Sequence, residues 1–404
     1  NYTPIVQETF GRDFSAISSE LNNAALTFDG STAGNVVVDG TASVYAITMT
    51  AGSYVLKNGS SPGSLDVESS ITVSGDADLE SQLSTLEGNL IYLEDNARLT
   101  LSSAANSTIS LLFAEDDTTV HIKAGTAVTF DEVKAMGALV VDTNATAIFA
   151  NESDVTIAGA ISGGGSVQFT NGGEVASVVY TLAGAEQIYS DITVGSTDSA
   201  LAPRVTLAVP TAETGKFSIL ADGELCLLQS GSFGSTATGD GWLTVADGAS
   251  IRFDVQAAAA SFASTLNLQV QGSAIVGSET NLFSGKLASD VEVSGKLTVH
   301  AMPGSVSLDS VTLNGGHVHF DDVFENGKGY MVAPFFHSIG SLYVGEEGGT
   351  ISNDHRQGFY ALRSNTDIAA LAGSGHLHLQ SESHDTLNLF RIASVGTEGF
   401  EGNI

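Results

Sequence analysis

Residues 160–169 read AISGGGSVQF, and residues 370–379 read ALAGSGHLHL. The two stretches match position by position, and both carry glycine at the fourth and sixth positions. Each ends in a segment in which apolar and polar residues alternate, which is typical of a strand with one buried face. The same glycine-broken strand thus occurs twice in the sequence. Because one turn cannot bury its apolar face alone, this repetition predicts a protein of stacked, similar turns.

A second pattern supports this prediction: an apolar residue, a turn at Gly or Asn, and then an apolar–x–apolar strand. Gly and Asn tolerate the left-handed backbone that such turns require. The starts of the five copies are 29, 19, 79 and 25 residues apart, so we expect an all-β solenoid with irregular coil length and side loops. The copies are LEDNARLTL at 93–101, IKAGTAVTF at 122–130, VDTNATAIF at 141–149, LADGELCLL at 220–228 and VADGASIRF at 245–253.

The composition favours strands and turns over helices. The chain has 404 residues, with 45 Gly and 6 Pro, and long helical patterns are absent. Its single cysteine, Cys226, lies among apolar neighbours and is expected to be a small buried hydrophobic residue. No apolar run approaches the length that spans a membrane, so we expect no membrane insertion. The formal net charge of -32 repels phosphate groups, which argues against nucleic acid as a partner.

The repeat pattern also suggests how the chain is organised. Residues 1–24 lack the pattern and are expected to form a lead-in or cap. Residues 25–404 are expected to form one continuous β-helix that is incomplete at its C-terminal end. Because the chain begins without Met or a signal segment, we interpret it as an internal piece of a longer precursor. A cut solenoid exposes strand edges, so we also expect weak end-to-end self-association.

The glycine-broken stretches resemble the autotransporter-associated β-strand repeat, in which apolar residues, G-x-G and an alternating strand follow one another. The longer run GGTISNDHRQGFYALRSNTDIAALAGSGHLHL at 348–379 resembles the same family. ALTFDGSTAGNVVVDGTASVYAITMTAGSYVLKNG at 25–59 resembles the opening coils of such secreted passengers. The resemblance implies an elongated right-handed parallel β-helix that is secreted or displayed on the outer membrane of a Gram-negative bacterium.

Histidines are the strongest anomaly in the sequence, because eight of the nine lie between residues 300 and 384. His317 with His319, and His376 with His378, form H-x-H pairs whose imidazoles lie about 7 Å apart on one strand face. These four are the candidate metal ligands, and the alternative is solvent-facing surface histidine. The 59 residues from His317 to His376 correspond to two or three coils, about 10 to 14 Å of stacking. We therefore expect no single four-histidine site, no tight structural zinc and no cofactor.

Other candidates for binding are aromatic and acidic residues. Alternation in GDGWLTV predicts that Trp242 points outward. An outward tryptophan could stack on a sugar ring, and the alternative is that Trp242 packs against a strand or a loop. GKGYMVAPFFHSIG at 327–340 interrupts the alternation, which predicts a side loop. The remaining candidates are Tyr330, Phe335 and Phe336 in that loop, and Asp354 with His355 in SNDHRQ. Phe-Asp recurs at residues 28, 130, 253 and 320 and is interpreted as a strand-ending turn.

No stretch of the sequence matches a catalytic motif, so no catalytic residue is predicted. The GDSGS-type serine stretch of protease passengers is absent, and the glycines at 163–165 lack a Lys or Ser/Thr placed to hold a phosphate. We interpret the chain as a non-enzymatic stalk or adhesin-like surface that contacts a host or environmental glycan or protein. The alternatives are a carbohydrate-active β-helix enzyme and a metal-binding surface module. Two acids or histidines facing one groove would favour the enzyme.

Overall fold

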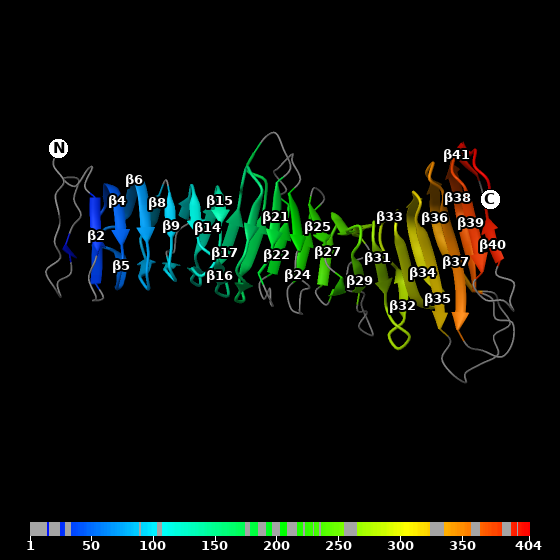
Figure 1. Cartoon of the computed structure of the whole chain (residues 1–404), viewed down its shortest axis with the longest axis horizontal. Helices are drawn as coiled ribbons and strands as arrows, with labels where there is room; N and C mark the ends of the chain where they lie inside the picture. Colours follow the sequence, from blue (N-terminus) through cyan, green and yellow to red (C-terminus); the bar gives the residue numbers. More distant parts are fainter. Residues whose placement is uncertain are drawn as a thin grey trace. The chain divides into compact units, whose positions relative to one another are not determined.

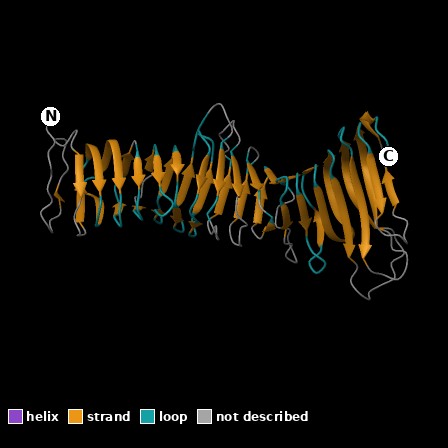
Figure 2. Ribbon diagram, in the orientation of Figure 1, coloured by secondary structure: helices purple, strands orange, loops and turns teal. Residues whose placement is uncertain are grey.

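In the computed structural model, the described residues form strands and turns and contain no helix (Figure 2). The strands pair in parallel and wind as a right-handed β-solenoid, which confirms the predicted fold class. The structure describes residues 14–15, 25–28, 34–88, 90–102, 107–173, 178–184, 191–195, 203–207, 216–220, 223–228, 230–233, 236–253, 265–323, 335–356, 364–381, 389–393 and 395–404. The chain divides into two compact units.

Unit 1 comprises residues 1–209 and 214–218, and successive turns add strands to parallel sheets (Figure 1). The first sheet contains β1 (Phe14–Ser15), β3 (Gly34–Val38), β5 (Ser53–Asn58), β7 (Asp78–Ser81), β10 (Arg98–Leu101), β13 (Thr119–Ile122), β16 (Ala138–Val141) and β19 (Ile161–Ser162). The second contains β2 (Ala25–Phe28), β4 (Thr41–Met49), β6 (Ser64–Val73), β8 (Thr85–Gly88), β9 (Ile91–Leu93), β11 (Ser107–Ile109), β12 (Leu112–Ala114), β14 (Ala127–Phe130), β15 (Val133–Ala135), β17 (Thr146–Phe149), β20 (Ser166–Phe169) and β22 (Asp191–Val194). The third contains β18 (Val155–Ile157), β21 (Val179–Leu182) and β23 (Arg204–Leu207), and β24 (Lys216–Ile219) lies at the end of the unit.

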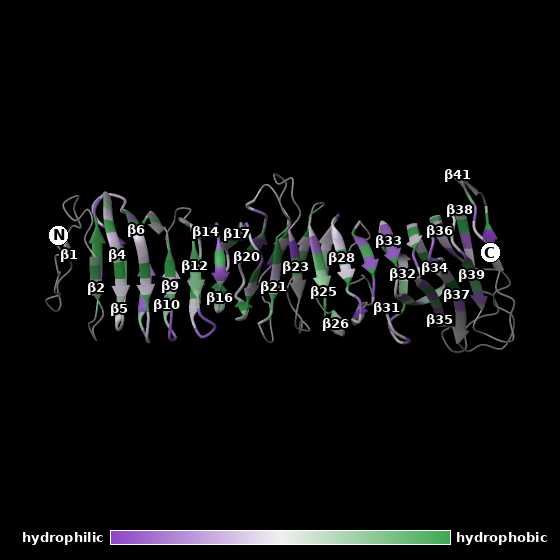
Figure 3. Ribbon diagram, turned by 45° about the horizontal axis from the view of Figure 1, so that its top comes forward, coloured by the Kyte–Doolittle hydropathy of each residue, from purple (hydrophilic) through white to green (hydrophobic). Residues whose placement is uncertain are grey.

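The register of unit 1 shows the irregular coil length that the sequence predicts. Leu79, Leu99, Val120 and Leu139 lie side by side on successive strands, at spacings of 20, 21 and 19 residues. All four side chains are buried, and the residue that follows each of them in its strand is half-buried, except Thr100, which is buried. In Figure 3 the strands of unit 1 carry hydrophobic residues, and hydrophilic turns join them. Burial of the alternating apolar residues therefore holds the turns together.

Unit 2 comprises residues 210–213 and 219–404, and some of its strands are longer than those of unit 1. The buried residues Val311, Leu342 and Leu371 lie in register, at spacings of 31 and 29 residues. Its strands are β25 (Glu224–Leu227), β26 (Gly231–Phe233), β27 (Thr236–Gly239), β28 (Trp242–Val245), β29 (Ser250–Phe253), β30 (Asn267–Val270), β31 (Ser273–Val276), β32 (Phe283–Lys286), β33 (Asp290–Val293), β34 (Lys296–Leu313), β35 (His317–Val323), β36 (Phe335–Val344), β37 (Gly349–Arg356), β38 (Ser364–Gly373), β39 (Leu377–Ser381), β40 (Leu389–Ile392) and β41 (Val395–Phe400).

The paired glycines of the two repeated stretches serve the same purpose in both units. Gly163 has φ +101° and Gly373 has φ +113°, a backbone region that other residues rarely adopt. A Cβ atom on Gly163 would lie 2.1 Å from the carbonyl oxygen of Val141, and one on Gly373 would lie 2.1 Å from that of Val344. Both corners therefore need glycine because the backbone of the preceding turn occupies the place of a side chain.

The predicted faces of the repeated strands are confirmed with one difference. Val167, Phe169 and Leu377 are buried, whereas Leu379 is only half-buried. The polar positions between them face outward: Ser166, His376 and His378 are exposed and Gln168 is half-buried. Cys226 is fully buried, as predicted. Of the expected lead-in, only β1 lies within the described residues, and it pairs in parallel with β3.

Candidate functional site

A polar groove lies on unit 1, where successive turns pass the same corner. Ser110 lies between β11 and β12, Glu132 between β14 and β15, and Glu152 between β17 and β18. The groove has a volume of about 800 Å³. It is lined by Ser110, Asp131, Glu132, Lys134, Ala150, Glu152, Ser153 and Gly172. A hollow with convergent polar groups is the usual place for a binding site.

The buried residue Asn151 lies between Ala150 and Glu152 in the chain, and both of these neighbours line the groove. The side chain of Asn151 is fully buried, and its Nδ2 donates to the carbonyl oxygen of Val133 at 2.7 Å. Its Oδ1 accepts from the N–H of Val133 at 3.2 Å, so the amide pairs with both backbone groups of a residue in the preceding turn. The N–H of Asn151 donates to the hydroxyl of Tyr180 at 2.8 Å, and this hydroxyl donates to the carbonyl oxygen of Thr170 at 2.7 Å. The corners are therefore fixed to one another by hydrogen bonds that water does not reach.

Glu132 is the central charged group of the groove and is already engaged. Its Oε1 accepts short hydrogen bonds from Lys134 Nζ and from Ser153 Oγ. Its Oε2 accepts from the N–H of Glu152 at 3.0 Å. Burial raises the pKa of Glu132, but the hydrogen bonds from Lys134, Ser153 and Glu152 outweigh burial and hold this pKa below its ordinary value. Glu132 is therefore a fixed carboxylate.

Asp131, the neighbouring carboxyl group, has the opposite character. Burial raises the pKa of Asp131 above its ordinary value, and the charge of Glu152 raises it further. Two adjacent acids in one groove whose pKa values move apart are typical of sites where carboxyl groups have different roles. The strand-ending turn predicted for the Phe-Asp pairs is confirmed at Phe130, where β14 ends, and is wrong at Phe320, because β35 continues through Asp321 to Val323. The prediction gave no indication that Asp131 lines a groove.

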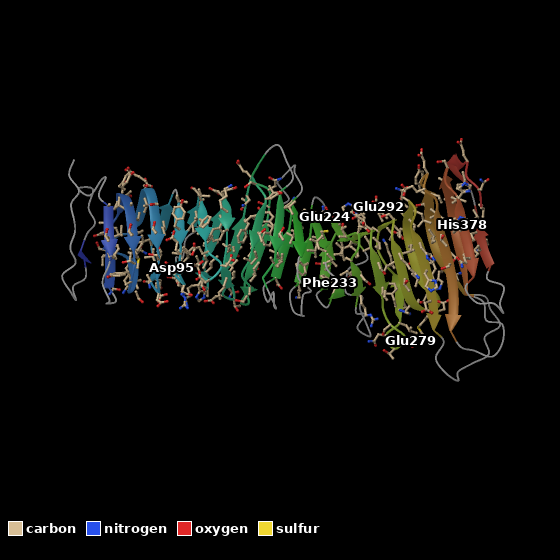
Figure 4. All side chains as sticks on the ribbon, in the orientation of Figure 1. Asp95, Glu224, Phe233, Glu279, Glu292 and His378 are labelled. Atoms are coloured by element: carbon tan, nitrogen blue, oxygen red, sulfur yellow. The ribbon has the colours of Figure 1, made fainter. Side chains whose placement is uncertain are left out.

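The histidine pairs lie on unit 2, and the structure does not bring them together. His317 is in register with Thr350, and Thr350 is in register with His378, so a strand separates the two histidines. His376 and His378 are exposed, and His378 is labelled in Figure 4. Within the described part of the chain, no three His, Cys, Asp or Glu side chains form a group that could hold a metal ion.

His319 differs from the solvent-facing histidine expected from the sequence. It is only 6 % exposed, and it is in register with Ser352 of β37. The hydroxyl of Ser352 is 2.8 Å from His319 Nδ1 and 2.6 Å from His317 Nε2, and the Ser352 side chain is fully buried. Alternation correctly places His317 and His319 on the face opposite the buried Val318, but the expectation that both face solvent is wrong, because His317 is half-buried and His319 is buried.

A second polar group in unit 2 lies inside the solenoid. His337 Nε2 is 2.9 Å from Asp322 Oδ1, and both side chains are fully buried. The ring of His337 stacks on Phe320 with centroids 4.5 Å apart and an interplanar angle of 8°. The N–H of Val306 points at His337 Nδ1 at 3.3 Å, so the ring proton lies on Nε2 and is donated to Asp322. Asp322 shares the parity of Phe320, which is a sequence signal for an inward position.

Among the other predicted binding residues, Trp242 is the one whose side chain lies within the described part of the structure. Trp242 is half-buried on β28, in register with Glu224 and Asn267. Tyr330 lies outside the described residues. The side loop predicted for residues 327–340 is wrong for residues 335–340, because Phe335 and Phe336 begin the strand β36. Asp354 and His355 lie on β37, and the side chains of these four residues are outside the described part of the structure.

Comparison of the chain with protein-family models, with curated proteins and with solved structures gives no match. Among the described segments, no helix has the length and apolar character needed to cross a membrane. The fold defines the chain as a parallel β-solenoid protein, and the groove on unit 1 is its candidate site.

Proposed function

We propose that this chain is a non-enzymatic segment of a secreted or surface-displayed β-solenoid, whose outer face contacts a glycan or protein. The resemblance to autotransporter passengers supports the location and the role. The non-enzymatic assignment rests on the hydrogen bonds that both carboxylate oxygens of Glu132 accept. Both of its oxygens are held by Lys134, Ser153 and the Glu152 N–H, so the central carboxylate of the groove is not free to attack a bond or activate water.

A binding screen combined with a degradation screen tests this function. The full chain is applied to arrays of glycans and extracellular matrix proteins, and the same preparation is incubated with soluble polysaccharides while reducing ends are measured. An interaction segment binds at least one immobilised partner and releases no reducing ends. Release of reducing ends that rises with protein concentration and is lost in Asp131→Asn would contradict the proposal.

A carbohydrate-active enzyme is the second candidate, because the groove meets the condition set by the sequence. Asp131, Glu132 and Glu152 face one hollow, and the pKa of Asp131 is raised by burial and by Glu152. Glycoside hydrolysis uses one carboxyl group that keeps its proton and a second that is ionised. In this function Asp131 is the acid and Glu152 the carboxylate. Both Asp131→Asn and Glu152→Gln would then abolish hydrolysis, whereas a binding segment shows none to abolish.

A further inference from the structure

Two aromatic side chains, one exposed and one half-buried, lie in contact on strands of unit 1. Tyr92 of β9 and Phe113 of β12 are in register on the outer face of unit 1, and their ring centroids are 5.8 Å apart with an interplanar angle of 53°. Phe113 is 37 % exposed and Tyr92 is half-buried. On the two preceding strands of this ladder, the residues in register with Tyr92 are Thr72 of β6 and Thr48 of β4. Along this row of in-register residues, two threonines are therefore followed by two aromatic rings.

Register places the pair next to the lining of the groove. Leu112 is in register with Val133, and Phe113 with Ala135, with a shift between the two pairs. Lys134 therefore occupies the strand next to Phe113, at the position of the shift. Ser110, which lines the groove, precedes Phe113 by three residues, about 10 Å along an extended chain. Tyr92 and Phe113 belong to the ladder β9–β12–β15, and Lys134 lies on β15 of the same ladder.

We propose that this combined surface, the groove together with Tyr92 and Phe113, binds an uncharged oligosaccharide. The proposal rests on the proposed function, for which it names the partner and the site. The carboxylates of Asp131 and Glu152 and the hydroxyl of Ser110 accept hydrogen bonds from sugar hydroxyls, and the ammonium of Lys134 donates them. Sugar rings have apolar C–H faces, and the exposed face of Phe113 offers them an apolar contact.

The geometry of the groove suits a chain of sugars. Corners of successive turns line it from Ser110 through Glu132 and Glu152 to Gly172, which is three strand spacings, about 14 Å. One strand spacing is close to the length of one hexose unit, so each sugar meets a new corner. Asn151 and Glu132 fix these corners before a ligand arrives, so binding orders few side chains.

Charge selects an uncharged sugar over two other ligands. The three carboxyl groups of the groove and the net charge of -32 repel anionic polysaccharides. A basic peptide is less suited, because the ammonium group of Lys134 lines the groove and already pairs with Glu132. The aromatic pair adds a contact that a lysine-rich peptide does not need.

The test uses the full chain and calorimetric titration with short neutral oligosaccharides of cellulose, mannan and N-acetylated chitin. Oligogalacturonate and oligolysine serve as the anionic and cationic comparators. At least one neutral oligosaccharide binds, and Phe113→Ala weakens it about tenfold or more, through lost stacking and lost apolar contact. Glu152→Gln weakens it as well. The matched control is Tyr45→Ala, which removes an exposed aromatic ring from β4, outside the groove, and leaves binding unchanged.

Three results overturn the proposal: no neutral oligosaccharide binds, only a charged comparator binds, or a neutral one binds equally well to Phe113→Ala and Glu152→Gln. The last result rejects this surface but leaves the proposed interaction function intact. Release of reducing ends from a bound oligosaccharide rejects the non-enzymatic function and keeps the site. Circular dichroism of each variant confirms that the strands are retained, so a loss of binding is not a loss of fold.

Discussion

Replacing Asn151 by alanine removes the amide that joins two successive corners of unit 1. The N–H and the carbonyl oxygen of Val133 both lose their bond to this side chain, at a place that water does not reach. A buried backbone group without a partner costs about 1 to 3 kcal/mol. Two such groups, with partial relaxation of the corner, predict that Asn151→Ala lowers the free energy of unfolding by about 2 to 4 kcal/mol.

Asn58 offers a matched control for this prediction, because it makes the same kinds of bond at an exposed corner. Its Nδ2 donates to the carbonyl oxygen of Gln82 at 3.1 Å, and its Oδ1 accepts from the N–H groups of Gly63 and Ser84 at 2.7 and 3.1 Å. Water replaces these bonds when Asn58 becomes alanine, so the expected cost is about 1 kcal/mol or less.

The assay follows from the architecture. Stacked turns need not unfold in one step, so urea unfolding by circular dichroism is combined with hydrogen exchange read by mass spectrometry. Asn151→Ala is expected to speed exchange across β14, β15, β17 and β18 and to lower the urea midpoint. Equal unfolding free energies for Asn151→Ala and Asn58→Ala would refute the argument that burial, rather than the number of bonds, sets the cost.

Three further predictions concern the glycine corner, the buried pair and alkaline pH. Gly163→Ala lowers the unfolding free energy in urea by more than Gly125→Ala. Both glycines have positive φ, but only at Gly163 would a Cβ atom meet the neighbouring backbone. Equal losses of unfolding free energy in the two variants would contradict this. His337→Ala costs about 3 to 5 kcal/mol by leaving Asp322 buried without its partner, and the double replacement His337→Leu with Asp322→Leu costs less; a larger loss in the double variant than in His337→Ala would count against the pair. Burial raises the pKa of Tyr180, so the stability linked to its protonated form is complete below the ordinary tyrosine pKa of about 10 and is lost as pH rises toward the folded value. Ultraviolet titration is expected to show one tyrosine that ionises only when unit 1 unfolds, and that delayed step is absent in Tyr180→Phe.

The sequence predicts the fold better than the site, and particular residues show why. Alternation is a local signal, so it correctly places Val318 and Phe320 inside. The same alternation continues to Asp322, which is fully buried although carboxylates generally prefer the surface. The groove depends on Glu132 and Glu152, which are 20 residues apart and share a corner only because the coil has that length. Coil length varies along this chain, so no local pattern predicts which residues meet at a corner.

The glycine corners have a consequence for how such a protein changes over time. Gly163 lies against the backbone of Val141, and Gly373 against that of Val344, so each corner fits the main chain of its neighbour whatever side chains that neighbour carries. A turn can therefore be duplicated, deleted or exchanged as a unit without loss of fit. The outward residues are then free to diverge, as Ser166 and Gln168 in one copy and His376 and His378 in the other show. New binding surfaces can arise by genetic copying of a turn followed by substitution on its outer face alone.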